Sequence, residues 1–240
     1  MPIAPSSQDC RVLELRQYTL HRGQRDTLVD LFDREFVETQ EAAGMRIIGQ
    51  FRDLDDADRF VWLRGFADMQ SRRAALTAFY DGPVWAAHRD AARATMVDTS
   101  DALLLKPARP GAGFDLSASR PGPGAVAVPP GIVACVVHGL ETSADAVAAA
   151  RLEAALAPRL AEAGAAFLAS FVTDTSANTF PRLPVREGEE VYIWLAASPD
   201  GASLGERLPG LAEIARQALG EGQILQRLRL APTSRSQLRA

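Results

Sequence analysis

The sequence predicts an α+β protein made of two tandem ferredoxin-like βαββαβ domains whose sheets face each other, as in a dimeric α/β-barrel. Apolar residues alternate in short segments and recur at helical spacing in longer ones, in the order βαββαβ. The same order occurs twice, because EAAGMRIIGQF at 41–51 aligns with AEAGAAFLASF at 161–171, an offset of 120 (161 minus 41). A stretch rich in Pro and Gly separates the two copies at 108–131.

The first domain spans residues 10–107 and should contain four strands and three helices. Short apolar segments bounded by turn residues indicate strands, which we place at 12–20, 45–52, 59–66 and 103–105. Helical spacing of apolar residues indicates helices, which we place at 25–43, 68–78 and 83–96. Gly44 ends the first helix as a C-cap. Pro83 begins the last helix, where its missing N–H is not needed.

The second domain spans residues 132–232 and repeats this order. We expect a strand at 132–140, an Ala-rich helix that ends at Ala163, a helix at 204–219 and a last strand at 223–230. FVWLR at 60–64 resembles YIWLA at 192–196, at an offset that has grown to 132 (192 minus 60). The loop of the second hairpin, at 174–190, is therefore longer than that of the first.

Comparing the two copies reveals an exchange of polar for apolar residues in the first and third strands. Four residues of the first copy align with residues that are mostly apolar in the second: Glu14, Arg16, Tyr18 and Arg64 align with Ala134, Val136, His138 and Ala196. Burying charges is costly unless they are paired, so a copy without a function would tend to lose them. The exchange predicts a polar site in the first domain and an apolar scaffold in the second.

This site should form where the first and third strands lie side by side. Glu14, Arg16 and Tyr18 share one face of the first strand, and Trp62 and Arg64 share one face of the third. If that face looks toward the helices, the last helix adds an aromatic and an imidazole side chain and completes a small-ligand pocket. The residues that would add these side chains, together with the aromatic residue before the helix, are Trp85, His88 and Tyr80.

We assign hypothetical roles to these side chains. His88 is the candidate acid or base, since its pKa lies near operating pH. Arg16 and Arg64 would hold an oxyanion or carboxylate, and Glu14 would complete the catalytic set by orienting groups. The substrate-binding candidates are Tyr18, Trp62, Tyr80, Trp85 and His138. In the alternative interpretation the charges are structural ion pairs, the tryptophans belong to the core and both histidines are structural.

Three separated motifs, in the right order over residues 12–107, resemble the NIPSNAP family. They are VLELRQYTLHRGQRDTLVDLF at 12–32, FVWLRGF at 60–66, and GPVWAAHRDAARATMVD at 82–98 followed by LLLKP. The family usually has Asn where Arg93 stands, so a polar contact is expected to differ there. The resemblance implies a ferredoxin-like fold of the dimeric α/β-barrel superfamily, and it settles no function.

Composition and missing motifs exclude several classes of function. The net charge of −4, with acids and bases interspersed, argues against a nucleic-acid surface. No apolar run approaches membrane-spanning length and the N-terminus lacks the features of a signal peptide, so we expect a cytoplasmic protein without a membrane partner. The sequence has no GxxxxGK[ST], GxGxxG or HExxH motif and no pair of CxxC motifs, so we expect neither a metal nor a cofactor.

Three hypotheses for function remain. The first is a cofactor-independent enzyme, of isomerase, cyclase or oxygenase type, that performs acid/base chemistry on a small organic substrate with an aromatic or polyketide-like skeleton. This hypothesis rests on fold analogy with the superfamily. The second is a non-catalytic small-molecule-binding or scaffold protein. The third is haem binding through His88 or His138, since some members of the superfamily carry haem. We expect a small-molecule ligand, intramolecular pairing of the two domains and a further homodimer.

Overall fold

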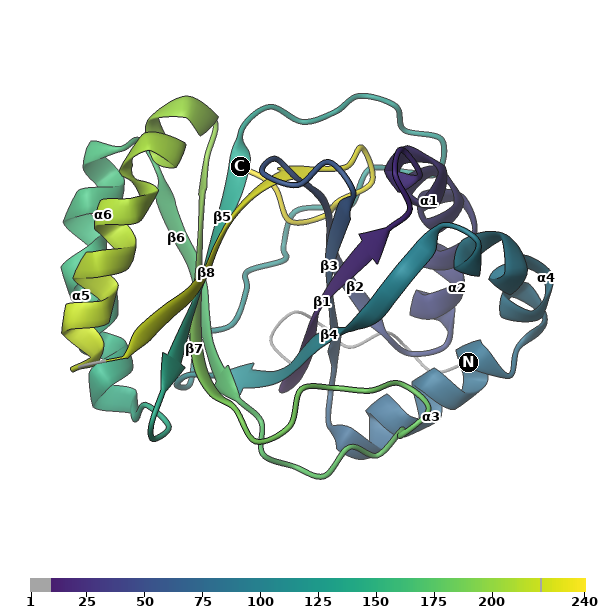
Figure 1. Ribbon diagram of the computed structural model, residues 1–240, viewed down its shortest axis with the longest axis horizontal. Coiled ribbons are helices and arrows are strands. Elements are labelled where there is room, and N and C mark those ends of the chain that lie inside the picture. Colours follow the sequence, from purple (N-terminus) through teal and green to yellow (C-terminus); the bar gives the residue numbers. More distant parts are fainter. Residues whose placement is uncertain (1–9, 221) are drawn as a thin grey trace.

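Eight antiparallel strands form one closed barrel in the computed structural model, which describes residues 10–220 and 222–240 (Figure 1). The strand order around the barrel is β1-β3-β2-β8-β5-β7-β6-β4. The strands of the first half are β1 (Val12–Leu20), β2 (Arg46–Asp53), β3 (Arg59–Phe66) and β4 (Met96–Pro107). Those of the second half are β5 (Ile132–Leu140), β6 (Ala166–Thr173), β7 (Glu190–Ser198) and β8 (Gln223–Pro232).

The helices cover the outside of the barrel, one set for each half, at opposite ends of the view in Figure 1. The first half carries α1 (Arg25–Leu31), the π-helical turn η2 (Phe32–Phe36), α2 (Val37–Ala42), α3 (Met69–Tyr80) and α4 (Pro83–Arg93). The second half carries α5 (Ala146–Glu162) and α6 (Gly201–Leu219). Within the described ranges, no helix has the length and apolar character needed to cross a membrane.

The predicted fold class is confirmed, and the two four-stranded sheets are joined at both edges. Strand β2 pairs with β8, for example Phe51 with Pro232, and β4 pairs with β6, for example Leu105 with Thr173. Joining the sheets satisfies the backbone groups that edge strands would otherwise leave unpaired. One chain therefore closes the barrel.

Strand register matches the sequence repeat residue by residue. Glu14 pairs with Arg64 across β1 and β3, and Ala134 pairs with Ala196 across β5 and β7. In the same way, Arg16 pairs with Trp62, and Val136 pairs with Trp194. The two halves thus have equivalent frameworks with different side chains on them.

Side-chain alternation along β1 separates two environments. Leu13 and Leu15 point into the barrel, where they join a buried apolar cluster drawn from both halves. Tyr18 belongs to a second cluster, which packs the outer face of β1 and β3 against helices of the first half. Glu14 and Arg16 share this outer face, so the predicted polar residues look toward the helices.

Two predicted helices have different boundaries in the structure. The helix expected over 25–43 is divided by the turn η2, and the helix expected to reach Met96 ends at Arg93. Met96 pairs instead with Leu20 as the start of β4. The backbone N–H of Thr95 bonds to the carbonyl of Ala92 at 3.1 Å and closes the helix. Strand pairing with β1 thus overrides the helical spacing of Met96.

The stretch at 108–131 forms no helix or strand, yet it packs against the barrel. Phe114 and Leu116 are buried in the interior cluster, together with Leu238 from the C-terminal segment. The Pro and Gly content of residues 108–131 predicts a linker without a core of its own. Two apolar side chains among its Pro and Gly residues make it part of the core instead.

Candidate functional site

A cavity of about 430 Å³ lies in the first half, between the outer face of the sheet and helices α1, α3 and α4. Its walls are mainly aromatic, with a few polar side chains. The lining residues from the first half are Tyr18, Leu28, Phe32, Phe36, Gln40, Trp62, Phe79, Tyr80, Trp85, Arg93, Met96 and Thr99.

The aromatic walls come from elements that are far apart in the sequence. Trp62 on β3 contacts Phe32 of the turn η2 edge to face, with ring centroids 4.9 Å apart. It contacts Tyr18 on β1 in the same way at 5.9 Å. Another part of the wall is formed by Tyr80 at the end of α3 and Trp85 near the start of α4, with ring centroids 4.9 Å apart. Edge-to-face packing of this kind fixes ring orientations, so the walls are rigid.

The long hairpin loop of the second half crosses to the first half and completes the cavity (Figure 1). Phe180 from this loop stacks on Tyr80, with ring centroids 5.9 Å apart. Thr179 donates its hydroxyl to the carbonyl of Met69 at 3.0 Å, and Arg182 pairs with Asp81 at 2.7 Å. The loop also contributes Arg182, Leu183 and Pro184 to the lining. The extra length of the second hairpin is thus used to cover a cavity of the first half.

Trp62 has a buried polar atom without a partner. Its side chain is 1% exposed, and no hydrogen bond is made by its indole Nε1. The equivalent Trp194 donates its Nε1–H to Nε2 of His138 at 3.1 Å. Because an unsatisfied buried donor is costly, the cavity wall offers a ready hydrogen bond to an acceptor.

Glu14 lies at the centre of a buried charge cluster behind the cavity. Its Oε2 accepts from Arg64 at 2.7 Å and from Arg16 at 3.1 Å, and its Oε1 accepts from Arg72 at 2.6 Å. All four side chains are fully buried. Burial alone would raise the pKa of Glu14, but the charges of Arg64, Arg16 and Arg72 together hold it far below its usual range. Glu14 is therefore an ionised centre of the cluster.

Arg72 was missed by sequence reasoning. It lies on α3 with Ala75, Leu76 and Phe79 on the buried face of that helix. A basic residue on an apolar helical stripe was the available signal, because such a charge must find a partner when it is buried. Besides Glu14, Arg72 donates to Asn178 Oδ1 at 2.9 Å and so links the cluster to the covering loop.

The charge cluster also holds groups that line the cavity. Arg64 donates to Gln40 Oε1 at 3.2 Å, and Arg16 donates to the Thr99 carbonyl at 3.2 Å. Burial raises the pKa of Tyr80, against the opposing charge of Arg64, so its phenol stays neutral at pH 7. Tyr80 is thus a hydrogen-bonding group of the wall.

The structure brings together seven of the nine predicted site residues. Glu14, Arg16 and Arg64 form the cluster, and Tyr18, Trp62, Tyr80 and Trp85 line the cavity. The other two, His88 and His138, lie elsewhere.

His88 does not complete the pocket, contrary to the prediction. Its side chain is 33% exposed, with Nε2 3.5 Å from Glu35 Oε2. It follows Trp85 by three positions on α4 and contacts Phe36, with ring centroids 6.4 Å apart, but it does not line the cavity. His138 is buried in the second half beside Trp194. Trp85 and Arg93 of α4 both line the cavity, and His88 lies between them along the helix but points to another side.

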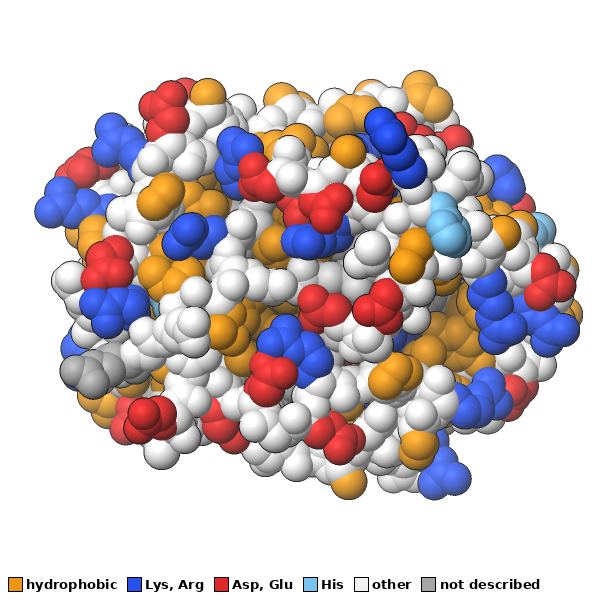
Figure 2. Space-filling model, viewed as in Figure 1, with side chains coloured by type: hydrophobic (Ala, Val, Ile, Leu, Met, Phe, Trp, Pro, Cys, Tyr) orange, Lys and Arg blue, Asp and Glu red, His pale blue; other side chains and the backbone are white. Residues whose placement is uncertain are grey.

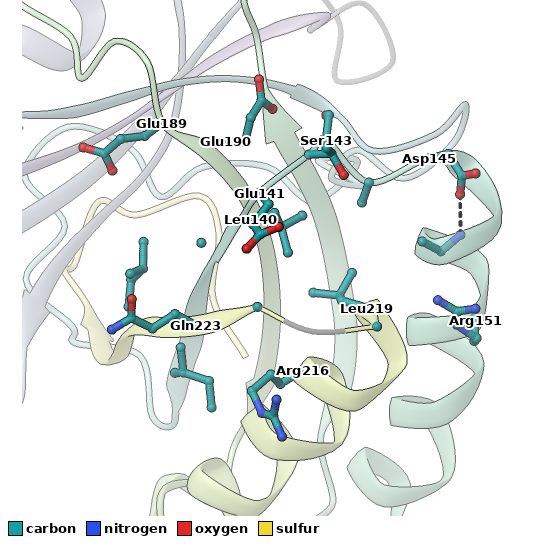
Figure 3. A pocket seen from close by; sticks show the side chains of 18 of the residues that line it. Leu140, Glu141, Ser143, Asp145, Arg151, Glu189, Glu190, Arg216, Leu219 and Gln223 are labelled. Atoms are coloured by element: carbon teal, nitrogen blue, oxygen red, sulfur yellow. Dashed lines mark hydrogen bonds between the residues drawn. The ribbon is translucent and has the colours of Figure 1, made fainter.

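The equivalent face of the second half is packed with apolar side chains. The outer face of β5 and β7 carries Ala134, Val136 and Ala196, which pack with apolar side chains of α5 and α6. A broad, open hollow of about 1240 Å³ lies instead near the ends of β5, β7 and β8 (Figure 3).

The polar side chains of this hollow bond mainly to neighbouring groups of the protein. Arg216 from α6 pairs with Glu213 at 2.6 Å, and Arg151 from α5 donates to the carbonyl of Ala218 at 2.6 Å. Asp145 caps α5 by accepting from the N–H of Ala148 at 2.8 Å. These groups do not converge on a common point. Throughout residues 10–220 and 222–240, moreover, no group of three or more His, Cys, Asp or Glu side chains could hold a metal ion.

Residues 13–110 match the NIPSNAP family model. No curated protein sequence matches the chain. A candidate monooxygenase from Fusobacterium nucleatum is 9% identical over 93% of each chain, with a TM-score of 0.56. Another from Lactobacillus acidophilus is 10% identical over 93% of this chain and 94% of that chain, with a TM-score of 0.51.

A third similar structure matches only the first half. It is a NIPSNAP domain protein from Burkholderia xenovorans, which is 16% identical over 40% of this chain and 93% of its own, with a TM-score of 0.37. At 9% and 10% identity, the two likenesses along the whole chain show a shared barrel fold and no shared chemistry. The family match, in contrast, is a match of sequence, and it is limited to residues 13–110.

Proposed function

We propose that the first half of this protein binds a flat aromatic small molecule in the cavity between its sheet and helices. The second half serves as scaffold and supplies the covering loop. The observation that carries this proposal is the unpartnered indole N–H of Trp62 in a buried aromatic wall. Apolar pockets with a few convergent polar groups are the usual form of small-ligand sites.

The comparison between the halves supports this proposal. In the second half the equivalent indole is satisfied by His138, and apolar residues fill the space before it. In the first half the donor is buried without a partner, at a cost of about 1–3 kcal/mol to the folded state. A carbonyl or phenol oxygen of a ligand would recover this hydrogen bond, and the aromatic walls would stack on its rings.

The charge cluster takes a positioning role in this proposal. Arg16, Arg64 and Arg72 are all held by Glu14, so none is available as a simple carboxylate clamp. The guanidinium of Arg64 lies 4.9 Å from the Trp62 ring and so helps to fix the wall. The structural interpretation of these ion pairs is thus favoured over direct contact with substrate.

A second candidate is a cofactor-independent enzyme in which negative charge develops on a ligand oxygen. The cluster joins three guanidinium groups to one carboxylate, an excess of two positive charges directly behind the cavity. Such a fixed field stabilises an oxyanion in a buried site. The fold shared with two candidate monooxygenases agrees with this candidate by analogy. His88 has no part in it, because it does not line the cavity.

The absorption of a bound nitrophenol tests this second candidate. The positive field should lower the apparent pKa of the bound phenol below its value in water. If binding leaves that pKa unchanged or raises it, the field does not favour an oxyanion and the enzymatic candidate fails.

The residues of this chain do not fit the haem hypothesis. An axial ligand must point into the cavity that holds the haem, and the lining of the aromatic cavity contains no histidine. His138 is bonded to Trp194, and His88 lies near Glu35 at the surface.

Paired Trp-to-Phe variants test the binding proposal. Binding of 2-naphthol and naphthalene would be measured by calorimetry for the wild type, Trp62→Phe and Trp194→Phe. We expect 2-naphthol to bind the wild type about tenfold more tightly than naphthalene, since one hydrogen bond has about this value. Trp62→Phe should remove this preference and leave naphthalene binding intact.

Trp194→Phe is the matched control, because it removes an indole N–H that already has a partner. This variant should keep the preference for 2-naphthol. Equal loss of the preference for 2-naphthol in both variants would show that the cavity is not the ligand site. Failure of all phenols with one to three rings to bind the wild type would show the same.

A further inference from the structure

Given the proposed function of the cavity, on which this inference rests, we infer that its ligand is an aromatic carboxylate. The ring system would enter first, with an oxygen toward Trp62, and the carboxylate would remain at the mouth on Arg93. This assigns to Arg93 a specificity role that neither the family match nor the fold provides.

The cavity has a buried end and an exposed end. Trp62 and Phe32 are almost fully buried and define the inner end. Arg93 and Arg182 also line the cavity, but both are exposed and so belong to its mouth. Figure 2 shows hydrophobic side chains inside a hollow on this face, with basic side chains beside it. A ligand that fills the cavity must therefore be apolar in its body and can be charged only at its outer end.

Arg93 is the cation at the mouth without an acidic partner. Its guanidinium lies over the ring of Trp85, 5.9 Å from the centroid. No ion pair is recorded between Arg93 and any carboxylate in the described parts of the chain. Arg182, on the other side of the mouth, already pairs with Asp81 at 2.7 Å. Arg93 is thus held in place by an aromatic contact that leaves its N–H donors for a ligand.

The charged side chains that line the cavity are all positive. It contains two arginines and no carboxylate, while the chain as a whole carries a net charge of −4. Behind the cavity, the cluster around Glu14 adds an excess of two positive charges. Both ends of the cavity therefore favour an anion over a neutral or cationic ligand.

A carboxylate fits this mouth better than a phosphate. A single unpaired guanidinium offers one planar fork of donors and one positive charge, which matches a planar monoanion. A phosphate monoester would retain negative charge next to the aromatic rim, without a second unpaired cation to compensate it. The chemistry of the mouth thus points to a ligand with one carboxylate on a flat ring system.

Matched pairs of probes test the inference. Each pair consists of a carboxylate and its primary amide on the same frame: benzoate, 2-naphthoate and 2-anthroate with their amides. Binding would be measured by equilibrium dialysis for the wild type, Arg93→Gln and Arg89→Gln. Arg89 is the control, because it lies on the same helix, is exposed, pairs with Asp90 and does not line the cavity. Both variants change the net charge equally.

We expect at least one carboxylate to bind the wild type about tenfold more tightly than its amide. Arg93→Gln should bring the two affinities together by weakening the carboxylate and leaving the amide unchanged. Arg89→Gln should preserve the difference. If carboxylates and amides bind equally, or if both variants act alike, the inference is overturned while the aromatic cavity stands. If neither form of any frame binds, the proposed function itself fails.

Discussion

Trp194 donates its indole N–H to Nε2 of His138 at 3.1 Å, and this buried pair occupies the place that Trp62 and Tyr18 hold in the first half. Both pairs sit on the same two strand positions of the repeat. In the second half the histidine satisfies the indole, and in the first half the tyrosine leaves it unsatisfied. The half in which the indole is unsatisfied is the one that carries the aromatic cavity.

His138 should make stability depend on pH between about 6.5 and about 4. Burial lowers its pKa from 6.5 to about 4, with a smaller contribution from Arg216. Between these pH values, His138 is therefore protonated in the unfolded chain and neutral in the folded protein. The contribution of neutral His138 to the free energy of unfolding is fully present above pH 6.5. It is lost as the pH falls from about 6.5 to about 4, by about 3 kcal/mol in all.

Urea unfolding of the wild type and His138→Gln at pH 7.5 and pH 4.5 measures this contribution. Glutamine can still accept from Trp194 and carries no titrating group, so the wild type should lose stability relative to the variant as the pH falls. The change in stability with pH must be compared between the two proteins, because a second group also titrates in this range. Burial raises the pKa of Asp33 to about 6, which stabilises the folded protein as the pH falls. An equal change in both proteins would show that His138 does not titrate as expected.

Glu14→Gln should be strongly destabilising. The variant leaves Arg16, Arg64 and Arg72 buried beside each other without a carboxylate, and breaking a buried ion pair in this way costs about 3–5 kcal/mol. Chemical denaturation at pH 7 measures the loss. Glu35→Gln, which removes a partly exposed carboxylate from the same half, should cost less than about 1 kcal/mol. A small loss for Glu14→Gln would mean that water or an anion reaches the cluster.

The joint replacement of Glu14, Arg16 and Arg64 by apolar residues separates the two interpretations of the cluster. With Arg72 changed as well, no unpaired charge remains, and a cluster that serves only itself should be replaceable with little loss of stability. If the cluster supports ligand binding, the same protein should remain folded and lose affinity for aromatic probes. Calorimetry with 2-naphthol decides between them. A folded variant with full affinity would exclude a role in binding.

Asn178→Ala should loosen the loop that covers the cavity without disturbing the buried charges. Asn178 accepts from Arg72 at 2.9 Å, which ties the loop to α3, and donates to the Leu183 carbonyl at 3.0 Å, which braces the loop internally. We expect faster amide exchange over residues 178–185 and weaker ligand binding, with β1 and β3 unchanged. Ser176→Ala is the control, because that residue lies in the same loop and is exposed. Equal exchange in both variants would contradict an anchoring role.

The sequence by itself determined the framework of this protein. Short segments bounded by turn residues placed β1, β3 and β5 at their true boundaries, and these strands are buried on both faces. The repeat predicted which residues of the two halves are equivalent, and strand register confirms it for Glu14 with Ala134 and Arg64 with Ala196. The alternation of side chains along the first and third strands also predicted that Glu14, Arg16 and Arg64 share one face of the sheet.

Only the tertiary structure decided what surrounds these residues. Helical periodicity groups His88 with Trp85 but does not give which part of that face meets the cavity. His88 points toward Glu35, whereas Trp85 and Arg93, before and after it on α4, line the cavity. Arg72 and Asn178 meet across 106 positions of sequence, and no local pattern predicts such a contact. The covering loop likewise reaches the cavity only when the two halves close one barrel. Whether the Trp62 N–H finds a partner depends on side chains such as Tyr18 and Phe32, which the fold brings to it from other elements.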